Sequence, residues 1–373
     1  VDVIGCRMKF TIAREKLLDP LQLTSGVVER RQTSPVLANL LLNLEEDRLV
    51  ITGTDQEVEL TVVITDVVVD SPGEVTVPAR KLLDICKSLP DGAEMSANLE
   101  GNRVAVDSGR FNSFLATLPV SEFPNIETGV YEVSIALSVE DLKRLLRRTS
   151  FAMAQQDVRY FFNGVLLEVL DGVVRFVATN GQRLATSFVS TGAQGSHQFI
   201  IPRKGVAELV RVLDEDSGEP VTLNFTANHM QVDRGNVRLI TKLIDATYPD
   251  YSRAIPSGGD KVVIADRQLL KEALSRTAIL SNELYRNVRL MLRPGKLDMH
   301  ANNPLQEEAE ETVTVEYEGD SLDIGFNVSY LIEALSAMKG DKVRMTFSDQ
   351  GSACLLEDLD EAESLYVISP MVL

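Results

Sequence analysis

The chain repeats one pattern three times, at intervals of about 125 residues. Phrases typical of a strand running into a helix occur as TVPARKLL at 76–83, IIPRKGVA at 200–207 and GFNVSYLI at 325–332. Pro78, Pro202 and Asn327 hold equivalent positions, with steps of 124 and 125 residues. Short strand-turn phrases centred on Thr54, Thr179 and Asn302 keep nearly the same step. Several markers in register indicate repeated structural units rather than chance similarity between ordinary α/β phrases.

The repeats predict three domains within the 373 residues. A copy of about 120 residues is long enough to close its own core. We expect domains at 8–127, 128–254 and 255–373, preceded at 1–7 by a tag or N-terminal extension that we exclude from the fold. Each copy reads as an α+β domain built from a duplicated βαβββ unit. In the first copy, helices should begin near Ala13 and Arg80, with Pro20 kinking or shortening the first of them.

Composition describes an ordinary water-soluble protein. Apolar residues make up 44% and charged residues 25% of the chain. No apolar run approaches the ~18 residues that a membrane span needs, so we expect no membrane association. Cys6, Cys86 and Cys354 are few and scattered, which favours free thiols in a reducing compartment and hence the cytoplasm.

The net charge of −18 argues at first against nucleic acid, but its placement matters more than its sum. Between 138 and 149 the helical period sets an apolar face opposite a basic face made of Lys143, Arg144, Arg147 and Arg148. The same partition recurs near 203, where the apolar side includes Val210, and near 80. The basic residues of these two segments are Arg203, Lys204, Arg211, Arg80, Lys81 and Lys87. If the repeats are related by rotation, these faces join into one positive surface, although a single basic helix face is more often simply solvated.

The sequence also bears on two other functional classes, an enzyme and a monomeric scaffold. His197, His229 and His300 are isolated, and the sequence has no phosphate-binding glycine loop, no Cys/His metal spacing and no nucleophile elbow. We therefore expect no catalytic residues, no metal and no cofactor, and set the enzyme class aside. The remaining alternative is a monomeric scaffold that binds peptides without encircling DNA.

Several phrases together resemble the bacterial DNA polymerase III β subunit, the sliding-clamp family. They are MKFT at 8–11, TVPARK at 76–81, QDVRY at 156–160, PRKG at 202–205, AILSNE at 278–283, QEEAEE at 306–311 and GFNVSY at 325–330. The resemblance runs from Met8 to Leu373. It implies a head-to-tail dimeric ring with helices inside, sheets outside and duplex DNA through the hole. It also implies a non-catalytic processivity function.

The resemblance assigns three sets of residues. The DNA-binding set is Arg31, Arg80, Lys143, Arg144, Gln156, Tyr160, Arg203 and Lys204. The partner-peptide groove is Phe162, Thr179, Gly181, Arg183, Leu184, Pro249, Arg253, Pro370 and Met371. The dimer interface is Lys81, Arg110, Phe111, Phe114, Leu115, Ile279, Leu280, Glu307, Glu308, Glu310 and Glu311.

The implied partners are double-stranded DNA, a second copy of the chain, the polymerase III α subunit and other polymerases, and the clamp loader. Mismatch-repair, ligase and initiator-regulating proteins with clamp-binding motifs complete the set. The groove departs from the commonest family pattern at Gln182, Ala254, Ser369 and Val372, so the peptide preference should differ.

Overall fold

The computed structural model describes residues 8–28, 34–213 and 219–372, and its element order follows the predicted repeats. The first repeat contains β1 Lys9–Ala13, α1 Arg14–Val27, β2 Asn39–Leu44, β3 Leu49–Thr54, β4 Val58–Ile64, β5 Val68–Ser71, β6 Gly73–Pro78, α2 Ala79–Ser88, β7 Glu94–Glu100, β8 Arg103–Ser108 and β9 Phe111–Ala116. Helices therefore begin where the sequence predicted them, and strand β5 is an addition to the duplicated βαβββ pattern.

The second and third repeats keep the pattern without the extra strand. The second contains β10 Val133–Leu137, α3 Val139–Thr149, β11 Gly164–Leu170, β12 Val173–Thr179, β13 Arg183–Ser190, β14 Ser196–Pro202, α4 Arg203–Leu213, β15 Val221–Phe225, β16 His229–Arg234 and β17 Val237–Lys242. The third contains β18 Lys261–Asp266, α5 Arg267–Thr277, β19 Asn287–Arg293, β20 Lys296–Asn302, β21 Glu308–Thr314, β22 Leu322–Asn327, α6 Val328–Ala337, β23 Lys342–Phe347, β24 Cys354–Asp358 and β25 Ser364–Ile368.

Six short 3₁₀ helices occur in the connections of the described segments. They are η1 Pro35–Ala38, η2 Val120–Glu122, η3 Ser150–Ala152, η4 Tyr160–Asn163, η5 Tyr251–Ala254 and η6 Ala278–Leu280. Two of them, η3 and η4, follow α3 and carry side chains of the site described below.

Two of the four sheets run from one repeat into the next. One has the order β10-β15-β16-β17-β4-β3-β2-β6, and β4 pairs antiparallel with β17, with Val62 opposite Val237. The other has the order β14-β11-β12-β13-β25-β24-β23-β18, and β13 pairs antiparallel with β25, with Leu184 opposite Val367. The remaining sheets are β5-β1-β7-β8-β9 and β21-β20-β19-β22.

Because these sheets cross the repeat boundaries, the chain forms two compact units. Residues 1–139 and 207–243 contain the first, and residues 140–206 and 244–373 contain the second. The central repeat contributes β10 and β15 to β17 to the first unit and β11 to β14 to the second. Main-chain pairing within each unit thus joins parts of two sequence repeats.

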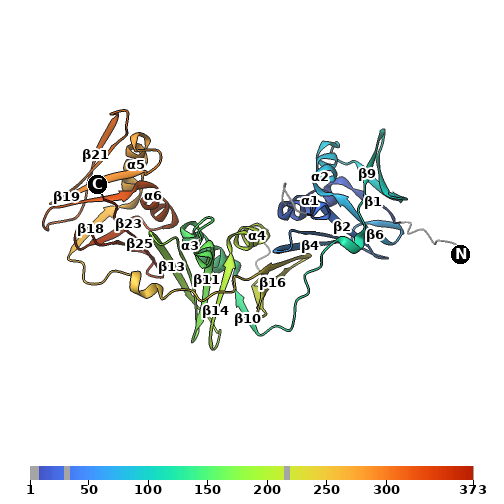
Figure 1. Cartoon of the computed structure of the whole chain (residues 1–373), viewed down its shortest axis with the longest axis horizontal. Coiled ribbons are helices and arrows are strands. Elements are labelled where there is room, and N and C mark those ends of the chain that lie inside the picture. Colours follow the sequence, from blue (N-terminus) through green and yellow to red (C-terminus); the bar gives the residue numbers. More distant parts are fainter. Residues whose placement is uncertain (1–7, 29–33, 214–218, 373) are drawn as a thin grey trace. The chain divides into compact units, whose positions relative to one another are not determined.

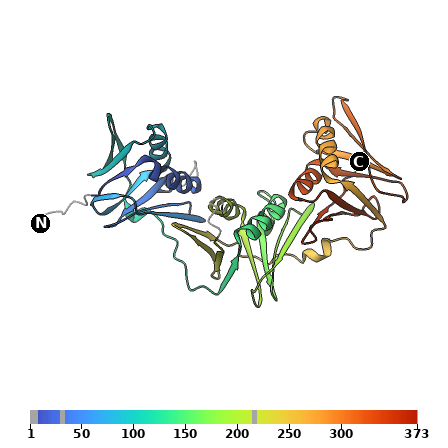
Figure 2. The same cartoon turned by 180° about the vertical axis from the view of Figure 1, so that it is seen from behind.

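Paired helices pack against the sheets of each unit. Helix α1 contacts β3 and β4 of the eight-stranded sheet, and α5 contacts β20 and β21 of the four-stranded sheet. In the first unit α1 and α2 lie side by side (Figures 1 and 2), and Leu82 and Cys86 enter a core shared with Phe10 and Leu42. In the second unit α5 and α6 lie together in the same views. No helix in the described segments is long and apolar enough to cross a membrane.

Three details differ from expectation. Of the two effects predicted for Pro20, a kink or a shortening, the shortening does not occur, because α1 continues through Pro20 to Val27. The Lys16 carbonyl, which loses its helical partner at Pro20, belongs to an exposed residue, where water can replace that partner. Arg148 is 1% exposed rather than on the basic face of α3. Val210, expected on the apolar face of α4, is 38% exposed.

Candidate functional site

The turn between β12 and β13 is held by two side chains that precede its tip. Thr179 Oγ1 donates to the Arg183 carbonyl at 2.6 Å and accepts from the Gly181 amide at 3.0 Å. Asn180 Oδ1 accepts from the amides of Gln182 and Arg183, both at 3.0 Å. Gly181 takes φ +87°, a conformation that favours glycine, so the turn is fixed by its own residues.

The equivalent turn of the first repeat is built the same way. Thr54 Oγ1 donates to the Val58 carbonyl at 2.9 Å and accepts from the Gln56 amide at 3.0 Å. Asp55 Oδ1 takes the place of the asparagine oxygen and accepts from the amides of residues 57 and 58. The threonine that repeats at positions 54 and 179 therefore marks a common turn structure. It does not by itself indicate a binding function.

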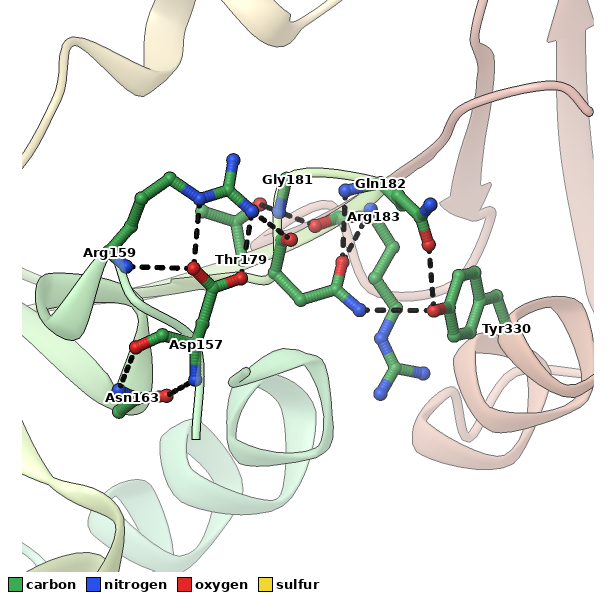
Figure 3. A network of polar contacts seen from close by, with 9 residues as sticks. Asp157, Arg159, Asn163, Thr179, Gly181, Gln182, Arg183 and Tyr330 are labelled. Carbon is green, nitrogen blue, oxygen red and sulfur yellow. Dashed lines mark hydrogen bonds and ion pairs between the residues drawn. The ribbon is translucent and has the colours of Figure 1, made fainter. Parts of the chain in front are cut away.

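A cavity of about 820 Å³ lies beside the β12–β13 turn in the second unit. It is lined by Phe151, Met153, Ala154, Gln155, Asp157, Arg159, Asn180, Gly181, Gln182, Arg183, Arg203, Tyr330 and Glu333. Figure 3 shows Arg159 and Tyr330 on opposite sides of the turn, each reaching one of its residues. We call this space the turn cavity.

Four of the charges in the turn cavity form two pairs. Arg159 donates from Nε and Nη2 to the two oxygens of Asp157, at 3.0 and 2.8 Å. The Arg159 side chain holds the pKa of Asp157 down to about 2. Arg183 forms an ion pair with Glu333, and its guanidinium lies 4.4 Å from the centre of the Tyr330 ring and 5.3 Å from that of Phe151. The cavity is therefore polar at its rim without being strongly charged there.

A buried apolar cluster lies next to the turn cavity. Phe162 and Leu184 belong to a buried cluster with Leu166, Val177, Tyr248 and Val367. The Arg159 guanidinium lies 4.8 Å above the centre of the Phe162 ring. Burial raises the pKa of the Tyr248 hydroxyl, so this side chain stays neutral at any physiological pH. The cluster adjoins the turn cavity, because Ala154 belongs to both and Arg159, which lines the cavity, lies over Phe162.

The structure brings together five of the nine predicted groove residues. Gly181 and Arg183 line the turn cavity, Thr179 holds its turn, and Phe162 and Leu184 belong to the adjoining apolar cluster. The other four lie elsewhere in the second unit. Pro249 and Arg253 are exposed at η5, where Arg253 binds Asp250 at 3.0 Å, and Pro370 is half-buried. Met371 pairs with Gly325 and lines a separate cavity of about 470 Å³ with Asn282 and Tyr285.

Sequence reasoning gave no role to several side chains that line the turn cavity. They are Phe151, Asp157, Arg159, Asn180, Tyr330 and Glu333. Asp157, Arg159 and Tyr330 fall within phrases that carried the family resemblance, which is the only signal that marked them. Residue spacing could not bring α6 next to the β12–β13 turn, because 150 residues separate Asn180 from Tyr330.

The predicted DNA-binding residues have different surroundings. Arg80 and Tyr160 are exposed, Tyr160 by 57%, and Gln156 is exposed with φ +56°. Arg144 binds Asp141 at 2.7 Å, and Lys143 and Lys204 are half-buried. Arg203 is exposed and lines the turn cavity, which the sequence did not indicate. Arg31 lies outside the described residues.

Predicted interface residues of the first unit lie on or near an edge strand. In the described chain β9 pairs with β8 alone, which leaves its other edge open. Phe111 and Phe114 on this strand are 39% and 47% exposed, and Lys81 and Arg110 are exposed. Leu115 is a correction: alternation along the strand turns it inward, where it is 5% exposed in the core.

Predicted interface residues of the second unit lie on and beside strand β21, the edge of its sheet. Ile279 is 75% exposed on η6, and Leu280 beside it is half-buried. Glu307, Glu308 and Glu310 are exposed. Glu311 instead binds Arg276 of α5 at 2.5 Å, a contact that lowers the pKa of its carboxyl. This carboxylate therefore already has a cation within its own chain.

Comparisons with known proteins match the whole described chain. Family models of the DNA polymerase III beta subunit match in order: the N-terminal domain at 8–127, the central domain at 136–250 and the C-terminal domain at 252–372. The beta sliding clamp of Pseudomonas aeruginosa is 51% identical over 368 residues, covering 98% of this chain and 100% of that protein. That of Escherichia coli K12 is 45% identical over 365 residues, covering 98% and 100%.

Solved structures agree with the sequence comparisons. The crystal structure of the Pseudomonas aeruginosa DNA polymerase sliding clamp with ligand has a TM-score of 0.92 at 50% identity, covering 98% of this chain and 100% of that one. The sliding clamp of Bartonella birtlesii bound to griselimycin has a TM-score of 0.94 at 34% identity, with coverage of 98% and 100%. Three family models in register and near-complete coverage of each relative show that this chain belongs to the DNA polymerase III beta subunit family, the beta sliding clamps.

Proposed function

We propose that the chain is a DNA sliding clamp, a ring-shaped homodimer that encircles duplex DNA and tethers the replicative polymerase to it. The observation that carries this proposal is the threefold match to the beta-subunit models in a chain half identical to a named beta sliding clamp. The clamp has no catalytic step of its own. Its three clamp domains are 8–127, 128–254 and 255–373, and it works in the cytoplasm.

Sliding follows from weak attraction combined with enclosure. Phosphate contacts are independent of sequence and weaken with salt, each contributing a log–log slope of about 0.9. Exposed or partly exposed cations on α2, α3 and α4, among them Arg80, Lys143 and Arg203, supply such contacts. A few contacts spread around a wide hole favour no particular register on the duplex. Topology then prevents escape, and a tethered polymerase meets the primer end at high effective concentration.

The open edges of β9 and β21 support a head-to-tail dimer. An unpaired strand edge with exposed aromatic side chains is a template for pairing with another chain. Phe111 and Phe114 on one edge complement Ile279 and Leu280 near the other, and Lys81 and Arg110 complement the acidic residues that precede and occupy β21. Exposed ion pairs contribute only about 0 to 1 kcal/mol each, so apolar contacts should dominate closure. A two-fold axis closes this heterologous contact into a ring.

The turn cavity and the adjoining apolar cluster are proposed to accept short peptide motifs from partner proteins. Aromatic side chains beside a few placed polar groups are typical of such a site, and the cavity places Phe151 and Tyr330 next to polar residues of the turn. Partners that carry these motifs would be the polymerase III α subunit, other polymerases, the clamp loader, and mismatch-repair, ligase and initiator-regulating proteins. Sliding clamps related to this chain have been solved bound to griselimycin, which supports a ligand site on this fold.

Retention on circular DNA tests the clamp function. Once loaded, the protein should remain on a closed DNA circle in high salt and leave when the circle is cut by a restriction enzyme. Equal loss from intact and cut circles would contradict enclosure. The native mass in solution distinguishes a dimeric clamp from the alternative function. A monomeric peptide-binding scaffold would have the 41.1 kDa mass of one chain at all concentrations.

A variant tests the partner groove. Arg183→Ala combined with deletion of Met371 to Leu373 should abolish partner-peptide binding while the dimer mass is unchanged. Arg183 is bound to Glu333 and packed on Tyr330, so its loss disturbs the cavity wall directly. Arg289→Ala, which removes an exposed arginine bound to Asp323 on the smaller sheet, is the matched control. Unchanged peptide affinity in the first variant would reject the site.

A further inference from the structure

The hydroxyl of Tyr330 on α6 joins two side chains of the β12–β13 turn. Asn180 Nδ2 donates to Tyr330 Oη at 3.2 Å, and Tyr330 Oη donates to Gln182 Oε1 at 3.1 Å (Figure 3). A phenol can accept one hydrogen bond and donate another at the same time. The two carboxamides are therefore linked in series through a single oxygen.

The direction of this series is set by the turn itself. Asn180 Oδ1 already accepts from two backbone amides, so only the NH₂ end of its carboxamide can face Tyr330. The Tyr330 oxygen must accept there, and its proton is then directed to Gln182. Because Gln182 Oε1 receives that proton, the NH₂ end of Gln182 is the end that remains for a ligand.

The Gln182 amide shares the cavity wall with two ion pairs and with the exposed cation Arg203. Arg159 is bound to Asp157 and Arg183 to Glu333, so neither pair adds net charge. The Arg183 guanidinium, 4.4 Å from the ring centre, packs on the face of Tyr330 and restrains the phenol. The main chain is restrained too, because the Ser369 amide donates to the Gln182 carbonyl at 2.8 Å. Backbone and side chain of Gln182 are thus both held.

We propose that Gln182 determines peptide specificity by donating to an acceptor oxygen of the bound partner peptide, and that Tyr330 is the positioning residue that orients it. The proposal rests on the peptide groove proposed above. A fixed amide donor favours a carboxylate or carbonyl of the peptide and rejects an ammonium, because the ammonium would leave both donors unpaired. Partners with an acidic or amide side chain at the position facing Gln182 should therefore bind best.

The probe is a short synthetic peptide carrying the clamp-binding motif of a polymerase III α subunit, made with Glu or with Lys at each position in turn. In the unmodified protein, one position should prefer Glu over Lys by about tenfold in Kd, the size expected for a hydrogen bond to a charged group. Gln182→Glu should reverse that preference. Tyr330→Phe should lower it to the value found for Gln182→Ala, and the double variant should lower it no further.

Tyr131→Phe is the matched control, since Tyr131 is 40% exposed, belongs to the first unit and does not line the turn cavity. Its preference should equal that of the unmodified protein. Retention of the full Glu preference in Tyr330→Phe would overturn the positioning role. A Glu preference that survives in Gln182→Ala would overturn the role of Gln182 as well.

Hydrogen exchange of the Asn180 side-chain amide, followed by NMR without peptide, tests the relay independently. Exchange should be faster in Tyr330→Phe than in the unmodified protein, and equal rates would overturn the relay. If the unmodified protein binds no peptide, the proposed peptide groove is rejected. The proposed role of Gln182 in peptide specificity is then rejected as well. The two failures are therefore distinguishable.

Discussion

Arg148 on α3 donates from Nη1 to Ser364 Oγ on β25 at 3.0 Å, with only 1% of the arginine exposed. It also forms an ion pair with Glu361, and Ser364 lies in turn 3.0 Å from the hydroxyl of Ser187 on β13. Burial lowers the pKa of Arg148, but an arginine remains charged at any physiological pH. This contact therefore joins the helix of one repeat to a sheet that two repeats share.

Replacing Arg148 should destabilise the second unit. Arg148→Met keeps the length of the side chain but leaves Glu361 without its cation, at a cost of about 3 kcal/mol in unfolding free energy. Arg147→Met, on the exposed side of the same helix, should change stability by less than about 0.5 kcal/mol. Urea unfolding of both variants measures the difference. Equal losses would show that the buried pair contributes nothing specific.

Substitutions at the equivalent residues Thr54 and Thr179 should have similar effects on stability but different effects on partner-peptide binding. Thr179→Val and Thr54→Val each remove a hydroxyl that makes two turn hydrogen bonds, so each should cost about 1–2 kcal/mol of stability. Only Thr179→Val should weaken partner-peptide binding, because only its turn borders the turn cavity. Peptide titration by fluorescence anisotropy checks this. Similar affinity loss in Thr54→Val would indicate a general unfolding effect.

Asp157 should titrate well below an ordinary aspartate. Its pKa is held to about 2, chiefly by hydrogen bonds from the Arg159 side chain, against 3.8 for an unperturbed group. Since the folded-state pKa is lowered, the contact is at full strength above about pH 4 and is lost as the pH falls through the folded value.

NMR titration of the Asp157 carboxyl carbon measures this pKa directly. In Arg159→Ala the midpoint should rise toward 3.8 without reaching it, because the backbone amide of residue 159 still donates to Asp157. An unchanged midpoint would show that the arginine does not hold the carboxylate in solution.

Exposed aromatic residues on β9 should be needed for the dimer. Phe111→Asp with Phe114→Asp places two charges on the open edge, and the protein should then have the 41.1 kDa mass of a single chain in native mass spectrometry. Val68→Asp is the matched control on β5, the opposite edge of the same sheet, where the side chain is 65% exposed. A dimer that survives the double substitution would reject β9 as the interface.

The threefold period, the starts of the helices and most of the buried faces could be read from the sequence, because these depend on local periodicity and turn chemistry. Thr54 and Thr179 repeat in the sequence since the same hydrogen-bonded turn needs the same hydroxyl at the same place. Leu82, Cys86 and Leu142 are buried as helical spacing required. The family resemblance added Gly181 and Arg183, which line one cavity.

The hydrogen-bond and ion-pair partners of the polar side chains were determined by the tertiary structure alone. Arg148 lies at the border of its helix's basic arc, and only the packing of β25 against α3 turns it from a surface cation into a buried one. Asn180, Gln182 and Tyr330 form one site because long-range β13–β25 pairing and the position of α6 bring together residues 150 positions apart. Periodicity reports which face of an element is buried, whereas partner choice depends on contacts between elements, for which a single sequence carries no local signal.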